Sequence, residues 1–216
     1  MKRPAKQRLA AAQDRVNHLA GADNTTWERA IRELHEAERE WAAARGQQYA
    51  ETVDIGAAWD VGAPLPHLIA GPHATYIVCY SQEPDPNWDG TYVTMLSPSD
   101  EEASALLVIE IARCHDIRYG GPNDEAIHGH PLHGKGLSSY RVHEVHNSEW
   151  LESVIRVNAV HPHHSDEPFR RLHHYVLSFH DEMIEALGQN IQATRVVGTF
   201  RSVLFDLVSR IVDQPI

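Results

Sequence analysis

The hydrophobic periodicity of the chain changes near residue 50, and this change limits the possible folds more than any other feature. Residues 4–46 repeat apolar side chains at spacings of three and four, as helices packed along one face do. After residue 50, short runs rich in β-branched and aromatic residues alternate with turns rich in Gly and Pro, as in β-sheets. We therefore expect an α+β protein: an N-terminal helical hairpin, a mainly antiparallel β-sheet or small open barrel or sandwich, and a covering C-terminal helix.

The helical hairpin, residues 1–46, is expected to be an appendage of a β body formed by residues 47–216. Its second helix begins at a capping box, Thr25-Thr26-Trp27-Glu28, in which a threonine hydroxyl and the Glu28 carboxylate satisfy free amides, and it ends at Gly46. Because the apolar stripe of the hairpin is narrow, it must pack either on the body or on its copy in a homodimer.

Six segments of the body are predicted strands: 75–80, 91–96, 105–111, 140–147, 173–179 and 183–187. The first two are expected to form a hairpin, and the third a central strand because it is apolar on both alternations. The last two are expected to form a second hairpin with His180 and Asp181 at its bend. Residues 199–213 carry a broad apolar stripe that predicts a helix covering the sheet.

Composition narrows the classes of protein to consider. Residues 51–216 hold ten Lys and Arg against twenty-three Asp and Glu, so this body repels phosphate backbones and no nucleic-acid partner is expected. The chain has no apolar run of eighteen residues and no secretory signal, which predicts a cytoplasmic protein without a membrane span. Cys79 and Cys114 are expected to be reduced thiols.

Histidine is concentrated in the middle of the chain. Twelve of the sixteen histidines fall in the sixty-six residues from His115 to His180. Neutral imidazole binds zinc, copper, iron and nickel, and it titrates near neutral pH. The clustering therefore points to a metal site, to acid–base chemistry or to pH sensing.

The metal hypothesis rests on His128-Gly-His130 and on His180. If the HxH pair lies on a strand, both imidazoles face one side, where a divalent transition metal (Zn, Fe, Cu or Ni) would bind. This pair resembles the HxH motif of the cupins, which implies a metal held inside a β-barrel. The chain departs from that pattern because it lacks the following glutamate and because Pro131 interrupts the segment, so we do not assign it to the family.

The metal-free hypothesis assigns catalysis to Glu125, Glu144, His161 and Asp181. A carboxylate that accepts from one imidazole nitrogen orients the ring and raises its basicity, which assembles a general base. A GxSxG motif, a P-loop and a dinucleotide fingerprint are absent, so no motif supports a hydrolase, ATP or NAD function.

Two classes of function remain open. The first is a small-molecule enzyme with a histidine and carboxylate site, with or without a metal, at the mouth of the sheet. The alternative is a non-catalytic module that binds a ligand, senses pH or contacts another protein. In the first case His130 and His180 are expected to face a common pocket, since each lies where a regular segment meets a turn.

Overall fold

A computed structural model of the protein describes residues 4–19, 21, 23–83 and 95–213. Its helices are α1 (Ala5–His18), α2 (Asn24–Ala44), α3 (Glu149–Asn158), α4 (Glu167–Arg170) and α5 (Phe200–Asp213), with a 3-10 turn η1 (Ile127–Gly129). Its strands are β1 (Tyr49–Val53), β2 (His67–Ala70), β3 (Ala74–Tyr80), β4 (Ser104–Ala112), β5 (Asp116–Gly120), β6 (Val142–His146), β7 (His173–Ser178), β8 (Met183–Gly188) and β9 (Asn190–Gly198).

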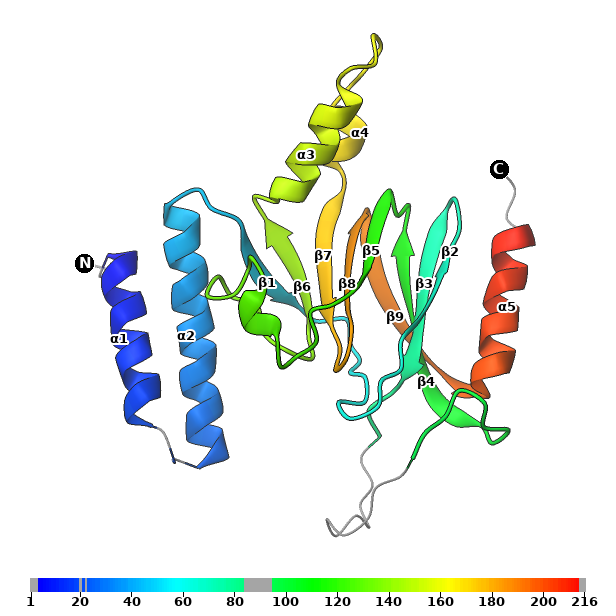
Figure 1. The fold of residues 1–216 in the computed structure, drawn as a ribbon, viewed down its shortest axis with the longest axis horizontal. Helices are drawn as coiled ribbons and strands as arrows, with labels where there is room; N and C mark the ends of the chain where they lie inside the picture. The colour runs from blue at the N-terminus through cyan, green and yellow to red at the C-terminus, as the bar shows by residue number, and fades with distance from the viewer. Residues whose placement is uncertain (1–3, 20, 22, 84–94, 214–216) are drawn as a thin grey trace.

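The strands form two antiparallel sheets that pack face to face (Figure 1). One sheet has the order β1-β6-β7-β8-β5 and the other has the order β2-β3-β4-β9. Their facing side chains make the main core, in which Ile109 of β4 and Leu177 of β7 are fully buried. The expected α+β architecture is confirmed in its open, sandwich-like form, because neither sheet closes into a barrel.

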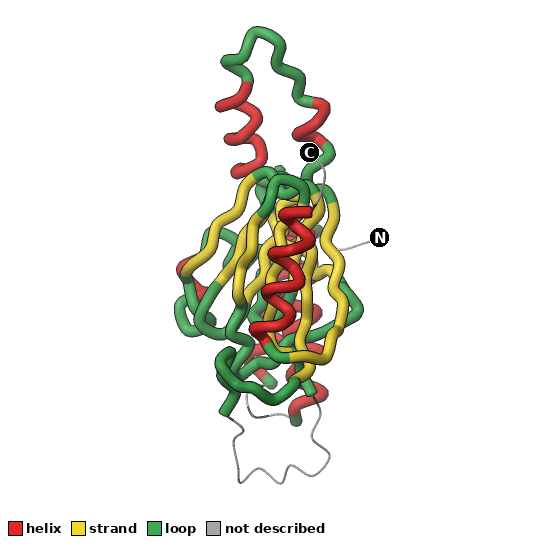
Figure 2. Tube along the Cα trace, turned by 90° about the vertical axis from the view of Figure 1, so that its right-hand side faces the viewer, coloured by secondary structure: helices red, strands yellow, loops and turns green. Residues whose placement is uncertain are grey.

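Helix α5 covers the outer face of the four-stranded sheet (Figure 2). Its Phe200 and Leu207 are buried against Tyr76, Tyr80 and Leu106 of β3 and β4. This contact confirms the predicted covering helix. Much of the rest of α5 is exposed, since only one side of a helix can rest on a flat sheet.

The N-terminal helices pack on each other and α2 also contacts the five-stranded sheet (Figure 1). The predicted capping box is wrong: the N-cap of α2 is Asp23, two residues before Thr25, and its carboxylate accepts the Thr26 amide at 3.0 Å, while Glu28 pairs with Arg32. At the body, the Glu38 carboxylate accepts the amide of Gly136 at 3.3 Å. The hairpin therefore rests on the loop before β6.

Most of the predicted strands are observed. Five of the six segments coincide with β3, β4, β6, β7 and β8, and β7 and β8 form the expected hairpin. The sixth, residues 91–96, lies mostly outside the described residues, and β3 pairs instead with β2 and β4. Strands β1, β2, β5 and β9 were not predicted, because each is short or lacks a strong apolar signal of its own.

Two expectations about composition can be compared with the structure. Cys79 and Cys114 are free thiols, as expected. Within the described part of the chain, none of the helices combines the length and the apolar character needed to cross a lipid bilayer.

Candidate functional site

The outer face of the five-stranded sheet carries polar side chains that are covered by the loop of residues 121–141. His174 of β7 and Glu185 of β8 project from this face between apolar neighbours such as Val176 and Met183. Leu132 of the loop packs on the same apolar neighbours and holds the loop down. Polar groups on this face are therefore partly closed off from water.

Three of these side chains are joined by short hydrogen bonds, and we call Ser148, His174 and Glu185 the relay. The Ser148 Oγ lies 2.8 Å from Nδ1 of His174, and Nε2 of His174 lies 2.9 Å from a carboxylate oxygen of Glu185. Ser148 is the N-cap of α3, directly after the turn that ends β6. That turn places Asn147 at a φ of 53°, a left-handed conformation that asparagine tolerates better than most residues.

The chemistry of the three groups fixes the direction of these hydrogen bonds. An ionised carboxylate only accepts, so Nε2 of His174 carries the hydrogen that Glu185 receives. In the neutral imidazole, Nδ1 is then an acceptor, and the Ser148 hydroxyl donates to it. The Ser148 oxygen in turn accepts the Leu151 amide at 3.1 Å. A hydroxyl, an imidazole and a carboxylate thus follow in the order found in nucleophilic triads.

A second imidazole supports the carboxylate of Glu185. Nδ1 of His130 accepts the Leu132 amide at 3.2 Å, so its Nε2 carries the hydrogen and points toward Glu185 at 4.0 Å. Burial alone would raise the pKa of Glu185, but the N–H groups of His130 and His174 outweigh it and hold the pKa well below its usual range. Glu185 is therefore a permanent anion at neutral pH.

Aromatic and cationic groups cover the relay. The ring of Trp150 meets His174 edge-on at a centroid distance of 5.0 Å. The Arg118 guanidinium lies 3.9 Å from the centroid of the Trp150 ring and 3.7 Å from Glu185. His174 and Ser148 are 3% and 6% exposed, whereas the Glu185 side chain is 17% exposed. Access to the serine in this structure is narrow.

A separate polar cluster lies at the bend between β7 and β8. His180 pairs with Asp181 at 3.0 Å, and this hydrogen bond raises the pKa of His180. Tyr140 donates its hydroxyl to Asp124, which raises the pKa of Tyr140 to about 12. The exposed Glu125 is close enough to act on His180 electrostatically. Three predicted site residues, His180, Asp181 and Glu125, therefore gather here.

The predicted HxH geometry is wrong. His128 lies in the 3-10 turn η1 and His130 follows it, so the two do not alternate along a strand. His128 is exposed, with its ring tilted against that of His133 at 4.8 Å between centroids, whereas His130 is buried against the relay. Glycine and proline on both sides of His130 favour turns over strand pairing, which accounts for the difference.

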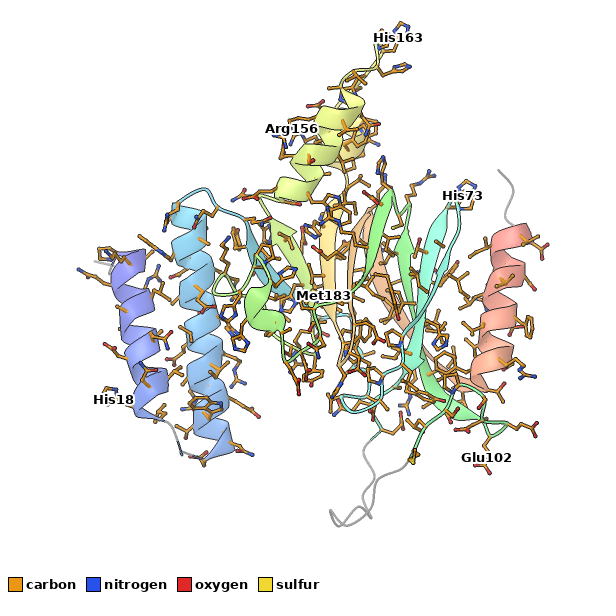
Figure 3. All side chains as sticks on the ribbon, viewed as in Figure 1. His18, His73, Glu102, Arg156, His163 and Met183 are labelled. Atoms are coloured by element: carbon orange, nitrogen blue, oxygen red, sulfur yellow. The ribbon has the colours of Figure 1, made fainter. Side chains whose placement is uncertain are left out.

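The remaining predicted residues lie elsewhere. Glu144 of β6 binds His173 through a 2.7 Å contact to Nδ1. His161 is exposed, with its ring 5.9 Å from that of His163. His163 marks the tip of the pair of helices, α3 and α4, that projects from the end of the sandwich (Figure 3). His161 is thus remote from the relay and from the bend.

Sequence reasoning passed over Ser148, His174 and Glu185 as site residues. One signal was present: Glu185 is the single charged residue in the apolar run Met183–Gly188, and a lone charge in a buried strand needs a partner. Another was the position of Ser148 between a strand and an amphipathic helix. These residues meet only when β7, which carries His174, pairs with β8, which carries Glu185. The register of that pairing depends on the whole fold.

The residues that the structure describes contain no group of three or more His, Cys, Asp or Glu side chains that could hold a metal ion. Comparisons of the chain with protein-family models, with curated proteins and with solved structures found no match. The functional argument therefore rests on the geometry of the site.

Proposed function

We propose that this protein is a small-molecule enzyme that transfers or hydrolyses an acyl group, with Ser148 as its nucleophile. The observation that carries the proposal is the relay: a hydroxyl that donates to an imidazole, which in turn donates to a buried, ionised carboxylate. This is the arrangement by which a neutral hydroxyl becomes a nucleophile. The relay supports acyl transfer as the reaction class of the enzyme with a histidine and carboxylate site that the sequence predicts.

The proposed reaction begins with attack of the Ser148 oxygen on the carbonyl carbon of an ester-like substrate. The hydroxyl proton passes to Nδ1 of His174, and the Glu185 carboxylate stabilises the resulting imidazolium through Nε2–H. As the leaving group departs it takes this proton from His174. Water then attacks the acyl-serine with the same assistance and releases the acid, which restores the hydroxyl.

In the first turn of α3 the Glu149 amide donates to Gln48 at 3.3 Å and the Leu151 amide donates to Ser148 Oγ at 3.1 Å. Among the described residues, this leaves the Trp150 amide as the donor for the oxygen of the tetrahedral intermediate. Ser148 caps α3, and the amides of the first turn of a helix have no partner within the helix. Their dipoles favour negative charge at this end. Because Trp150 and Arg118 pack over His174, a substrate must be small or must displace this pair to reach Ser148.

A fluorophosphonate probe, which reacts covalently with activated serine hydroxyls, tests the proposal directly. We expect peptide mass spectrometry to find the label on Ser148, and S148G to abolish both labelling and hydrolysis of p-nitrophenyl acetate. Glycine suits this variant because it replaces a serine N-cap at a cost of only a few tenths of a kcal/mol. The matched control is S165G at an exposed serine, which should keep full labelling. Labelling spread over surface serines, or hydrolysis unchanged in S148G, would refute the assignment.

A second candidate function is a non-catalytic module that responds to pH, and a specific observation favours it. Histidine–carboxylate pairs recur at 3.1 Å or less: His146–Glu51, His164–Asp166, His173–Glu144, His174–Glu185 and His180–Asp181. Histidine is the side chain whose ordinary charge change falls between pH 5 and 8, so it is the usual pH sensor in proteins. Hydrogen exchange measured at pH 7.5 and pH 5.5 would show concerted opening at these pairs if this function is correct, and uniform protection if it is not.

Three further expectations stand as proposals with simple tests. A bound zinc, iron, copper or nickel ion would appear in elemental analysis of the purified protein, at one equivalent per chain. A homodimer through the helical hairpin would give twice the chain mass in light scattering. A cytoplasmic location would be seen by fractionation of the producing cell.

A further inference from the structure

A large groove lies between helix α2 and the sheet edge, apart from the relay. It has a volume of about 870 Å³ and is walled by α2, by Glu51 and Thr52 of β1, and by Ser138, Ser139 and Arg141. This volume is in the range of small-molecule sites. The groove does not depend on the function proposed for Ser148.

Three of the four glutamates of the groove have an arginine or histidine partner. Glu33 binds Arg15 of α1 at 2.6 Å, and Glu51 is 3.1 Å from His146. Glu28 pairs with Arg32 within the lining at 3.8 Å. Only Glu36, of the four glutamates that line the groove, has no ion pair among the described residues.

The basic side chains are not neutralised to the same degree. Within the described ranges, Arg29, Arg39 and Arg141 of the lining have no carboxylate within 4.0 Å. Arg39 and Arg141 come from opposite walls, since α2 carries the first and the loop before β6 carries the second. The four arginines and four glutamates of the lining balance, so this groove is less acidic than the rest of a protein whose net charge is −11.

Histidine and hydroxyl groups extend this basic end. His143, fully buried in β6, is held by the Ser138 amide at 3.2 Å and by the Ser138 hydroxyl at 3.0 Å. His35 lines the groove, and both Arg39 and Arg141 are close enough to His143 to lower its pKa electrostatically. Arg39, Arg141, His35 and Ser139 therefore line the same groove, while the Ser138 hydroxyl is engaged with His143.

We propose that this groove binds a small-molecule oxyanion, a carboxylate or a phosphate, between Arg39 and Arg141. The planar guanidinium group donates two parallel hydrogen bonds to either oxyanion, and the Ser139 hydroxyl supplies a further donor. Two arginines on opposite walls of one groove, each without a carboxylate within 4.0 Å among the described residues, are the features that such a ligand requires.

Calorimetric titration of the full-length protein with citrate and with inorganic pyrophosphate, at low ionic strength, tests this proposal. We expect one site per chain for at least one of the two anions, and the preferred anion identifies the class of ligand. R39Q and R141Q should each weaken binding about tenfold, the effect of losing one charged hydrogen bond. R141Q is the more secure variant because Arg141 is exposed and can be replaced without disturbing the fold.

The matched control is R201Q, which removes the same charge from an exposed site on α5. It should change the affinity less than about twofold, since separated surface charges are screened by salt. Absence of binding by both anions would overturn the proposal. Equal weakening in R201Q and R141Q would also overturn it, because binding would then follow net charge and not this groove. S148G should bind the anion normally, so this outcome is separable from that of the proposed reaction.

Discussion

Replacing Glu185 with glutamine should destabilise the protein by about 2–4 kcal/mol at pH 7. The substitution keeps the shape of the side chain but removes the charge that receives the His174 N–H at 2.9 Å. A hydrogen bond to a charged group contributes about 1.5–3 kcal/mol. The amide NH₂ of glutamine also has to face an N–H group of His130 or His174, which leaves one buried donor without a partner.

Loss of the ion pair with Arg118 contributes little to the destabilisation of E185Q. The Arg118 side chain is 56% exposed and its guanidinium is 3.7 Å from Glu185, and an exposed ion pair of this kind is worth about 0–1 kcal/mol. Urea unfolding followed by circular dichroism measures the difference. The matched control is E102Q, at an exposed turn far from the relay (Figure 3), which should stay within about 0.5 kcal/mol of the wild type.

The pH dependence of the stability difference between wild type and E185Q is a second test of the hydrogen bonds to Glu185. The folded-state pKa of Glu185 is lowered from 4.5, so its ionisation stabilises the fold fully above that pH, and this contribution is lost as the pH falls through the lowered pKa. The gap between wild type and E185Q should therefore be constant from pH 6 to 8 and should shrink below about pH 4.5. A gap under 0.5 kcal/mol at pH 7, or one that does not shrink in acid, would refute the description of Glu185 as a buried anion.

Three further predictions follow from other parts of the fold. G136A should destabilise the protein by more than about 1 kcal/mol in urea, because Gly136 has a φ of +94° and an added Cβ would lie 2.3 Å from the Ala50 carbonyl oxygen; G129A, which meets no atom within 4 Å, should be nearly neutral. The pKa of His143 is lowered to about 3 by burial, so stability should fall as the pH drops from 6.5 toward 3, and H143Q should have a flatter profile; parallel profiles would contradict this. A shortened chain of residues 47–216 should unfold cooperatively, because the apolar side chains of the helical hairpin pack mainly on each other, and noncooperative melting would show that the hairpin belongs to the core.

The sequence predicted the fold well where one local signal dominated. Strand β7 and helix α5 were placed within a residue or two, because strong periodicity needs no knowledge of tertiary contacts. Strand β9 was missed, since its burial comes from pairing along β4. Its own residues include exposed Thr194 and Arg195, which weaken the local signal.

The site was harder to predict because its members meet only through strand register. Pairing of β7 with β8 brings the outer-face side chains His174 and Glu185 side by side, and the turn after β6 brings in Ser148. Of the predicted residues, only His130 reaches this cluster. Histidine density located the right region of the chain, but loop conformation decided which histidines are buried, and no local pattern encodes that choice.

The tautomer of His174 tests the relay most directly. Long-range ¹H–¹⁵N NMR of the imidazole side chains at pH 7 distinguishes a nitrogen that carries hydrogen from one that does not. The relay requires a hydrogen on Nε2 of His174, bonded to Glu185, and a bare Nδ1 that accepts the Ser148 hydroxyl. In E185Q this preference should weaken. A hydrogen found on Nδ1 of His174 in the wild type would contradict the account, because Ser148 could then not transfer its proton to that nitrogen.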